Sequence, residues 1–218
     1  MNQEIVYLFK ISMLIQINPQ NPQENRIHEV VSILQKGGII IYPTETIYGL
    51  GCDITQPKAI ELICRIKGIK PEKAQFSFIC SDLSHLSDYV KPIDTATYRI
   101  LKKTLPGPFT YIFNASNKVP KMVNSPKKTI GIRIPENQIA LALVKALGNP
   151  LLSTSLPEDL NQIENNTDPE LMEEIYGKRV NLVIDGGYGE FIPSTIVDFT
   201  GENPQIIRQG KGNFEEFI

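Results

Sequence analysis

Residues 37–52 have the sequence GGIIIYPTETIYGLGC. The apolar, β-branched run at 39–42 is typical of a buried strand, and Pro43 ends it because proline has no amide hydrogen for the strand ladder. The glycine pair at 37 and 38 marks the end of a preceding helix. The hydroxyls and glycines at 44–51 predict a loop. This stretch therefore predicts a helix, a buried strand and a loop in succession.

The same alternation extends in both directions along the chain. Helical spacing of apolar residues and β-branched runs predict an α/β (α+β) fold, and short turns between late strands favour a mixed sheet. In the helix at 94–103 we expect Ala96, Ile100 and Leu101 to face inward. Thr167 and Glu170 have the spacing of a capping box. Helices are predicted at 27–34, 59–66, 94–103, 137–147 and 167–176, and strands at 13–17, 39–42, 76–80, 110–113, 129–133, 151–155, 182–185, 195–199 and 205–208.

Composition places the chain among ordinary globular proteins. It has 218 residues, 41% hydrophobic and 21% charged, with a net charge of −2 that does not attract nucleic acid or membrane. Three separated cysteines (Cys52, Cys64 and Cys80) argue against a disulfide framework and predict a reducing, cytoplasmic location. Residues 13–218 are predicted to form one domain. Residues 1–12 are expected to be an extension ahead of a start near Met13.

Neither a membrane segment nor a structural metal site is expected. No run approaches the ~20 apolar residues that span a bilayer. The only histidines are His28 and His85, and no pair of cysteines has metal-ligand spacing, so a zinc site is not predicted.

Charge is distributed unevenly along the chain. Residues 65–73 hold four basic residues and one acid, and 118–133 hold five basic residues and no acid. Residues 158–174 hold seven acids and no base. Each segment alone is explained by a solvated face. The two basic segments flank strands of one predicted sheet, however, so together they also suggest an anion site.

The loop at 44–51 is the richest candidate for chemistry. Neither a P-loop nor a dinucleotide fingerprint is present, and neither histidine can form a catalytic triad. Thr44 and Thr46 can bond a ligand while the glycines let it approach, or they can be satisfied within a turn; the residues alone leave both open. Any catalysis must then rely on positioning and charge stabilisation.

Further along the chain, 107–110 (GPFT), Gly131 with Arg133, 153–155 (STS), 194–198 (STIVD) and 207–208 follow the opening motif in order. This combination, which covers the chain from about Met13, resembles the threonylcarbamoyl-AMP synthase (YrdC-like) family, and in detail its YciO branch. The resemblance implies a three-layer fold with a positively charged cavity. It also implies a reaction in which L-threonine, bicarbonate and ATP, with Mg²⁺, give threonylcarbamoyl-AMP and pyrophosphate for tRNA t6A modification.

The resemblance also implies roles for particular residues. The implied catalytic residues are Lys67, Arg133 and Ser155, those that bind substrate are Thr44, Ser153 and Ser194, and those that bind nucleotide are Lys70, Lys73, Thr110 and Arg208. Each has a structural alternative. Thr110 is an ordinary strand residue, Arg133 forms a surface ion pair, the serines cap strand ends, and the lysines lie at a solvated helix end.

The sequence departs from the synthase pattern at several positions. Residues 73–77 lack the family's Lys-Pro-Leu, and an acidic stretch replaces its Ser-Gly-rich loop. Ile69 stands where the family has arginine, and Leu156-Pro157 replaces its asparagine. Losing a guanidinium and an amide from an anion site costs about a few kcal/mol of transition-state stabilisation. Two hypotheses follow: a synthase-like nucleotidyltransferase, weak or altered in substrate, or a non-catalytic module that holds nucleotide, double-stranded RNA or tRNA in the same cavity. Tyr111 and Phe113, which alternate along a strand, are expected in the core rather than at an RNA interface.

Overall fold

One mixed sheet organises the protein. The computed structural model describes residues 13–120, 123, 128–157 and 167–217. Within these residues the strands are β1 (Met13–Gln16), β2 (Ile39–Tyr42), β3 (Gly49–Asp53), β4 (Ser77–Ile79), β5 (Phe109–Asn114), β6 (Thr129–Arg133), β7 (Leu151–Ser155), β8 (Leu182–Asp185), β9 (Thr195–Asp198) and β10 (Gln205–Arg208). The helices are α1 (Glu24–Gln35), α2 (Pro57–Lys67), α3 (Leu83–Ser87), α4 (Thr95–Thr104), α5 (Gln138–Leu147) and α6 (Pro169–Tyr176), with 3-10 turns η1 (Pro71–Lys73) and η4 (Glu215–Phe217).

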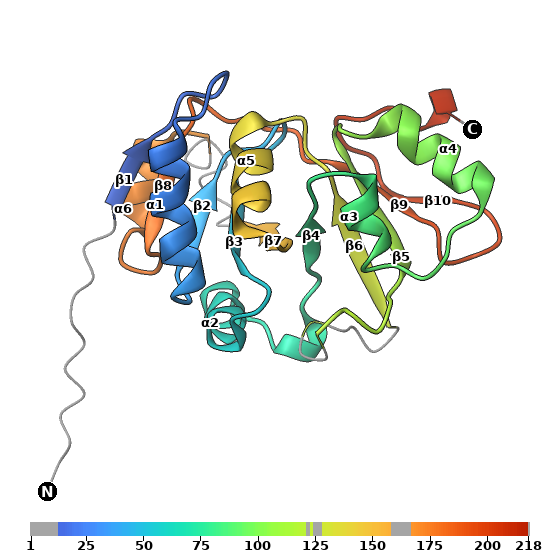
Figure 1. Ribbon diagram of the computed structural model, residues 1–218, viewed down its shortest axis with the longest axis horizontal. Coiled ribbons are helices and arrows are strands. Elements are labelled where there is room, and N and C mark those ends of the chain that lie inside the picture. Colours follow the sequence, from blue (N-terminus) through green and yellow to red (C-terminus); the bar gives the residue numbers. More distant parts are fainter. Residues whose placement is uncertain (1–12, 121–122, 124–127, 158–166, 218) are drawn as a thin grey trace, which may run out of the picture.

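The order of the strands in the sheet differs from their order in the chain. Neighbours follow the sequence β1-β8-β2-β3-β7-β4-β6-β5-β9-β10 (Figure 1). Parallel pairs such as β2 with β8 and β5 with β9 alternate with antiparallel pairs such as β2 with β3 and β9 with β10. The prediction of a mixed sheet is therefore confirmed.

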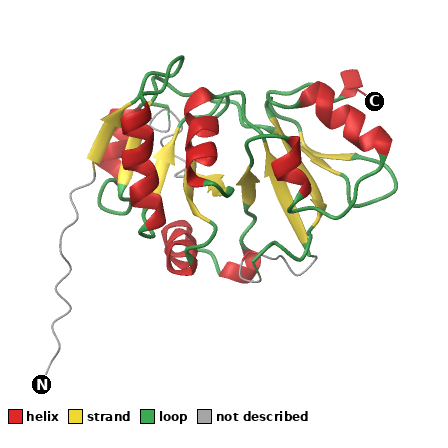
Figure 2. Ribbon diagram, in the orientation of Figure 1, coloured by secondary structure: helices red, strands yellow, loops and turns green. Residues whose placement is uncertain are grey.

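Helices cover both faces of the sheet, as β2 illustrates. Successive residues of a strand point to opposite faces. Ile39 and Ile41 enter a large core to which α2, α3, α4 and α6 contribute. Ile40 and Tyr42 enter a smaller core under α1 and α5. The result is a helix–sheet–helix arrangement of three layers (Figures 1 and 2).

Several elements begin and end where the sequence predicts. Asn137 accepts a hydrogen bond from the Ala140 amide (3.0 Å) at the start of α5, and Gly148 ends that helix with φ of 79°. Tyr111 and Phe113 lie in the core, as expected. The predicted extension at 1–12 lies outside the described residues. In the part of the chain that is described, no helix has the length and apolarity that crossing a bilayer requires.

Other local predictions were wrong. Gly49–Asp53, predicted as part of a loop, is the buried strand β3, and the short helix α3 was missed. Asp168 rather than Thr167 caps α6, because its carboxylate accepts a hydrogen bond from the Glu170 amide (2.9 Å). Ala96 is exposed on α4, although Leu101 is buried as expected.

Candidate functional site: a polar cavity on the sheet

A cavity of about 710 Å³ lies on the sheet beyond the area that α1 and α5 cover. Directly paired residues of neighbouring strands share a face. Ser77 pairs with both Ser153 and Gly131, and all three line the cavity. Two residues away on their strands, Ile79 and Leu151 belong to the core under α1 and α5. The cavity and this core therefore share one face of the sheet.

Short side chains form the floor of the cavity. At Gly131, an added Cβ would lie 3.3 Å from both the Phe76 carbonyl oxygen and the Ser77 Cβ. Serine and glycine thus occupy positions where larger residues would fill the space. The volume falls within the roughly 300–1,000 Å³ of typical ligand pockets.

Seven of the ten predicted site residues line this cavity. They are Lys73, Thr110, Arg133, Ser153, Ser155, Ser194 and Arg208. Thr44, Lys67 and Lys70 do not belong to the lining. Residues from β5, β6, β7 and β10 are thus brought together, although they are far apart in sequence.

Arg133 is held in a buried ion pair. Its Nη2 donates to Glu45 Oε1 (3.1 Å) and to Thr46 Oγ1 (3.0 Å), and the two charged side chains are 9% and 11% exposed. The alternative of a surface ion pair is wrong, because this pair is buried. Burial raises the pKa of the Glu45 carboxyl, and the Arg133 guanidinium opposes that rise. Among the described residues, Glu45 Oε2 and Arg133 Nε are buried without a hydrogen-bond partner.

Thr44 faces its own loop rather than the cavity. Its Oγ1 donates to the Ile47 carbonyl (2.7 Å), accepts from the Thr46 amide (3.1 Å) and lies 3.0 Å from Thr46 Oγ1. Thr46 in turn contacts Arg133. Thr44 therefore shapes the loop that positions the Arg133–Glu45 pair. This arrangement corresponds to the satisfied-turn alternative.

Lys67 is anchored to the end of β7. Its Nζ donates to the Ser155 carbonyl (2.8 Å), to Ser155 Oγ (3.1 Å) and to the Leu156 carbonyl (3.4 Å). These contacts hold Ser155, which lines the cavity, from the side of α2. Lys67 thus lies next to the cavity, and its charge fixes the backbone where β7 ends.

Thr110, Ser194 and Arg208 form a second polar group at the wall of the cavity. Thr110 Oγ1 lies 2.8 Å from Ser194 Oγ. The Arg208 guanidinium donates to the Ser194 carbonyl through Nη2 (2.9 Å) and Nε (3.3 Å). Because β5 pairs with β9 and β9 with β10, the sheet itself holds these three side chains side by side.

The Ser153 hydroxyl forms a hydrogen bond with a buried tyrosine, Tyr42. Tyr42 Oη lies 2.6 Å from Ser153 Oγ, and burial raises the pKa of Tyr42 to about 12. A Cβ at Gly49 would lie 2.8 Å from Tyr42 Cε1, and one at Gly51 would lie 3.0 Å from the same atom. The Tyr42 ring thus fills the space beside both glycines. Gly49 nevertheless lines the cavity, so the expectation that these glycines let a ligand approach is revised for Gly51.

The basic segments contribute unequally to the cavity. Lys73 and Arg133 line it, whereas Lys70 is exposed outside the lining. Lys118 pairs with Asp88 at 2.7 Å on the surface. Lys121 and Lys127, and residues 158–166 of the acidic segment, lie outside the described residues. The predicted anion site therefore draws on a few of these cations rather than on both segments as a whole.

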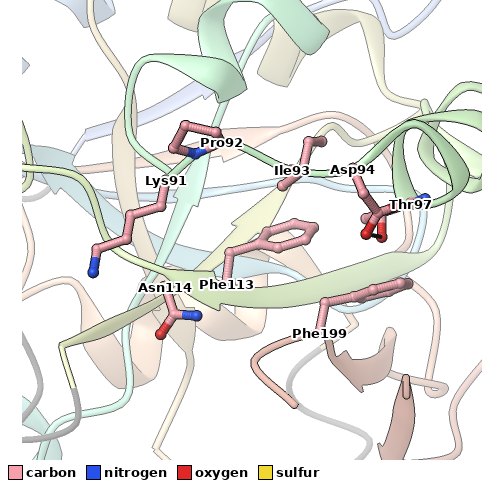
Figure 3. A pocket seen from close by; sticks show the side chains of 8 residues that line it. All are labelled: Lys91, Pro92, Ile93, Asp94, Thr97, Phe113, Asn114 and Phe199. Atoms are coloured by element: carbon pink, nitrogen blue, oxygen red, sulfur yellow. Dashed lines mark hydrogen bonds between the residues drawn. The ribbon is translucent and has the colours of Figure 1, made fainter. Parts of the chain in front are cut away.

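A second hollow is too small for a nucleotide. It measures about 100 Å³ and is lined by Lys91, Pro92, Ile93, Asp94, Thr97, Phe113, Asn114 and Phe199. Figure 3 shows the Phe113 ring between Lys91 and Asp94. The Asp94 carboxylate is already occupied in capping α4 through Thr97. The larger cavity is therefore the candidate site.

Sequence reasoning missed several residues of the site. Glu45 and Tyr42 support it from below, and Ser77 and Asp198 line it. The signal that the sequence offered for Glu45 was a single acidic residue between two threonines. Two of the departures also have a structural explanation: Leu156 is 4% exposed and Ile69 packs on the core, so both positions are used for apolar contacts.

Comparison with known proteins identifies the family. Residues 32–210 match the Sua5_yciO_yrdC family model, described as "Telomere recombination". The chain is 40% identical over 209 residues to YciO of Escherichia coli K12, covering 95% of this chain and all of that protein. The crystal structure of E. coli YciO superposes with a TM-score of 0.86 at 39% identity, covering 95% of this chain and all of that one.

Enzymes of the family are more distant relatives. A threonylcarbamoyl-AMP synthase of Coxiella burnetii (strain RSA 493 / Nine Mile phase I) is 32% identical over 178 residues, covering 81% of this chain and 94% of that protein. Sua5 of P. abyssi complexed with L-threonine superposes with a TM-score of 0.79 at 25% identity, covering 91% of this chain and 58% of that one. The chain therefore belongs to the Sua5/YciO/YrdC family.

Proposed function

We propose that the protein is a nucleotidyltransferase of the threonylcarbamoyl-AMP synthase type. It would convert L-threonine, bicarbonate and ATP into threonylcarbamoyl-AMP and pyrophosphate. Threonylcarbamoyl-AMP would then serve as the intermediate for tRNA t6A modification. The observation that carries the proposal is the single cavity in which Arg133, Arg208 and Lys73 meet the hydroxyls of β5, β7 and the segment before β9. The L-threonine complex of P. abyssi Sua5 supports an amino-acid ligand there.

The proposed reaction requires no nucleophile from the protein. The amine of threonine attacks the carbon of the one-carbon unit, and water leaves to give a carbamate. A carbamate oxygen then attacks the α-phosphorus of ATP, the bond to the β-phosphate oxygen breaks, and pyrophosphate departs. The protein would hold the anions in line and stabilise developing charge. Arginine suits this role because its planar guanidinium bonds two oxygens of a carboxylate or phosphate at once.

Mg²⁺ would enter with the nucleotide. The described residues contain no group of three or more histidine, cysteine or acidic side chains that could hold a metal. Mg²⁺ typically binds through substrate phosphates, waters and one or two carboxylates, and Asp198 supplies a carboxylate in the lining. The residues thus fit a nucleotide-borne ion, which would neutralise charge on the phosphates.

The test is pyrophosphate release that depends on ATP, L-threonine and bicarbonate together. Replacing Arg208 by Met should lower kcat/KM by about 10²-fold, the effect of removing one group that stabilises developing charge. Arg26→Met is the matched control, because Arg26 forms an exposed pair with Glu29 on α1. Omitting any one substrate should abolish release. Release at background level from the wild-type protein would contradict the proposal.

A non-catalytic binding module is the second candidate, and the apolar contacts of Ile69 and Leu156 favour it. Their positions would otherwise supply a guanidinium and an amide to the anion site. Under this hypothesis the protein binds ATP measurably but releases no pyrophosphate. Double-stranded RNA or tRNA would be the alternative occupant, and a gel-shift titration with each would detect it.

A further inference from the structure

We propose that Tyr42 is a positioning residue that sets the Ser153 hydroxyl as a hydrogen-bond donor to an oxyanion in the cavity. The two oxygens lie 2.6 Å apart, Tyr42 is fully buried, and Ser153 is 5% exposed. This inference rests on the proposed function in one respect, because it assumes that a carboxylate or a phosphate occupies the cavity.

The glycines of β3 make this contact between non-adjacent strands possible. Tyr42 is the last residue of β2, and Ser153 lies on β7, with β3 between them. Gly49 and Gly51 of β3 leave the space that the tyrosine ring occupies. A Cβ at Gly49 would lie 3.0 Å from the Tyr42 hydroxyl oxygen itself. The ring therefore lies across β3 and brings its hydroxyl to the floor of the cavity.

The direction of the hydrogen bond follows from what surrounds the two hydroxyls. Among the described residues, Ser153 Oγ is the hydrogen-bond acceptor that lies within reach of the Tyr42 hydroxyl proton. A buried donor without an acceptor costs about 1–3 kcal/mol, so Tyr42 should donate to Ser153. Burial keeps the phenol protonated, since its pKa rises to about 12. The Ser153 proton is then left to point toward the cavity that Ser153 lines.

Donation by Tyr42 also strengthens Ser153 as a donor. Hydrogen bonds in a chain polarise one another, so a hydroxyl that accepts one bond donates the next more strongly. The ligand oxygen could belong to the carboxylate of an amino acid or to a phosphate of a nucleotide. Both are oxyanions, and separate titrations distinguish them.

The experiment measures binding of L-threonine alone and of Mg·ATP alone by calorimetry. Tyr42→Phe removes one oxygen and keeps the ring. It should lower the binding affinity for one of the two ligands by about 3- to 10-fold. Tyr111→Phe is the matched control: Tyr111 is equally buried and donates to Thr104 Oγ1 (2.7 Å) within the other core. It should lose stability like Tyr42→Phe and bind both ligands like the wild type.

A double-mutant cycle separates positioning from general damage. Ser153→Ala should weaken the same ligand, and Tyr42→Phe combined with Ser153→Ala should bind no more weakly than Ser153→Ala alone. Additive losses, or wild-type affinity in Tyr42→Phe, would overturn the inference while leaving the proposed function standing. Failure of the wild-type protein to bind either ligand would overturn both.

Discussion

Replacing Glu45 by Ala should destabilise the protein far more than breaking an ion pair of equal length on its surface. The substitution leaves the Arg133 guanidinium in a site that is 9% exposed, with Thr46 Oγ1 as its remaining partner among the contacts described. Removing one partner of a buried pair costs about 3–5 kcal/mol because the other charge stays buried and uncompensated. That is a large share of the 5–15 kcal/mol typical of folded proteins.

A surface ion pair with the same N–O distance serves as the comparison. Lys211 and Glu190 also lie 3.1 Å apart, but their side chains are 37% and 54% exposed. Solvent screens such a pair, so Glu190→Ala should cost about 0–1 kcal/mol. Each substitution thus removes one glutamate carboxylate, from ion pairs that differ in burial.

Urea unfolding followed by circular dichroism measures the difference. With a slope of about 2 kcal/mol per molar urea, Glu45→Ala should lower the midpoint by about 1.5–2.5 M and Glu190→Ala by less than about 0.5 M. Equal shifts in the two variants would refute the reasoning, because burial of an unpaired charge would then not determine the cost.

Gly51→Ala should cost about 1–3 kcal/mol of unfolding free energy, since its Cβ would lie 2.9 Å from the Leu152 carbonyl oxygen, whereas Gly201→Ala, whose nearest atom would be 3.8 Å away, should be nearly neutral in thermal unfolding. Asp168→Ala should cost about 0.5–2 kcal/mol through loss of the α6 cap, and an unchanged melting temperature would contradict that assignment. Because burial raises the pKa of Glu45, the folded state holds the carboxyl proton more tightly than the unfolded chain does. The part of the stability that depends on this proton is complete below the ordinary glutamate pKa and is lost as pH rises through the raised value, whereas the hydrogen bond to Arg133 remains. Stability of the wild type relative to Glu45→Gln should therefore fall across that window in urea titrations, and a rise would show that pairing with arginine outweighs burial.

Local chemistry made much of the fold predictable. The cap and stop residues of α5 and the β-branched run of β2 each act within a few residues, so the sequence alone indicates them. β3 was missed because its glycines are poor strand formers. They are explained by the ring of Tyr42, which reaches them through strand pairing rather than through sequence proximity.

The site was predictable where it depended on the family motifs and not where it depended on long-range contacts. Seven of the residues inferred by resemblance line one cavity. The pairing of Arg133 with Glu45 and Thr46 joins positions more than 80 residues apart and leaves no periodic signal. Thr44 was assigned to a substrate through the family resemblance, whereas its hydroxyl bonds within the loop.

The strand order also constrains how the protein can be made. β1, the earliest of the described strands in the chain, pairs Met13 with Leu182, and β2 pairs Ile41 with Val183. Both must wait for β8, so the amino-terminal strands keep open hydrogen-bonding edges until most of the chain has been synthesised. Folds in which strands distant in sequence pair with one another form slowly. Until they form, the unpaired backbone N–H and C=O groups of their strands can pair with other chains. We therefore expect nascent chains truncated before β8 to be captured by chaperones and to resist compaction, and chains extended beyond it to become protease-resistant.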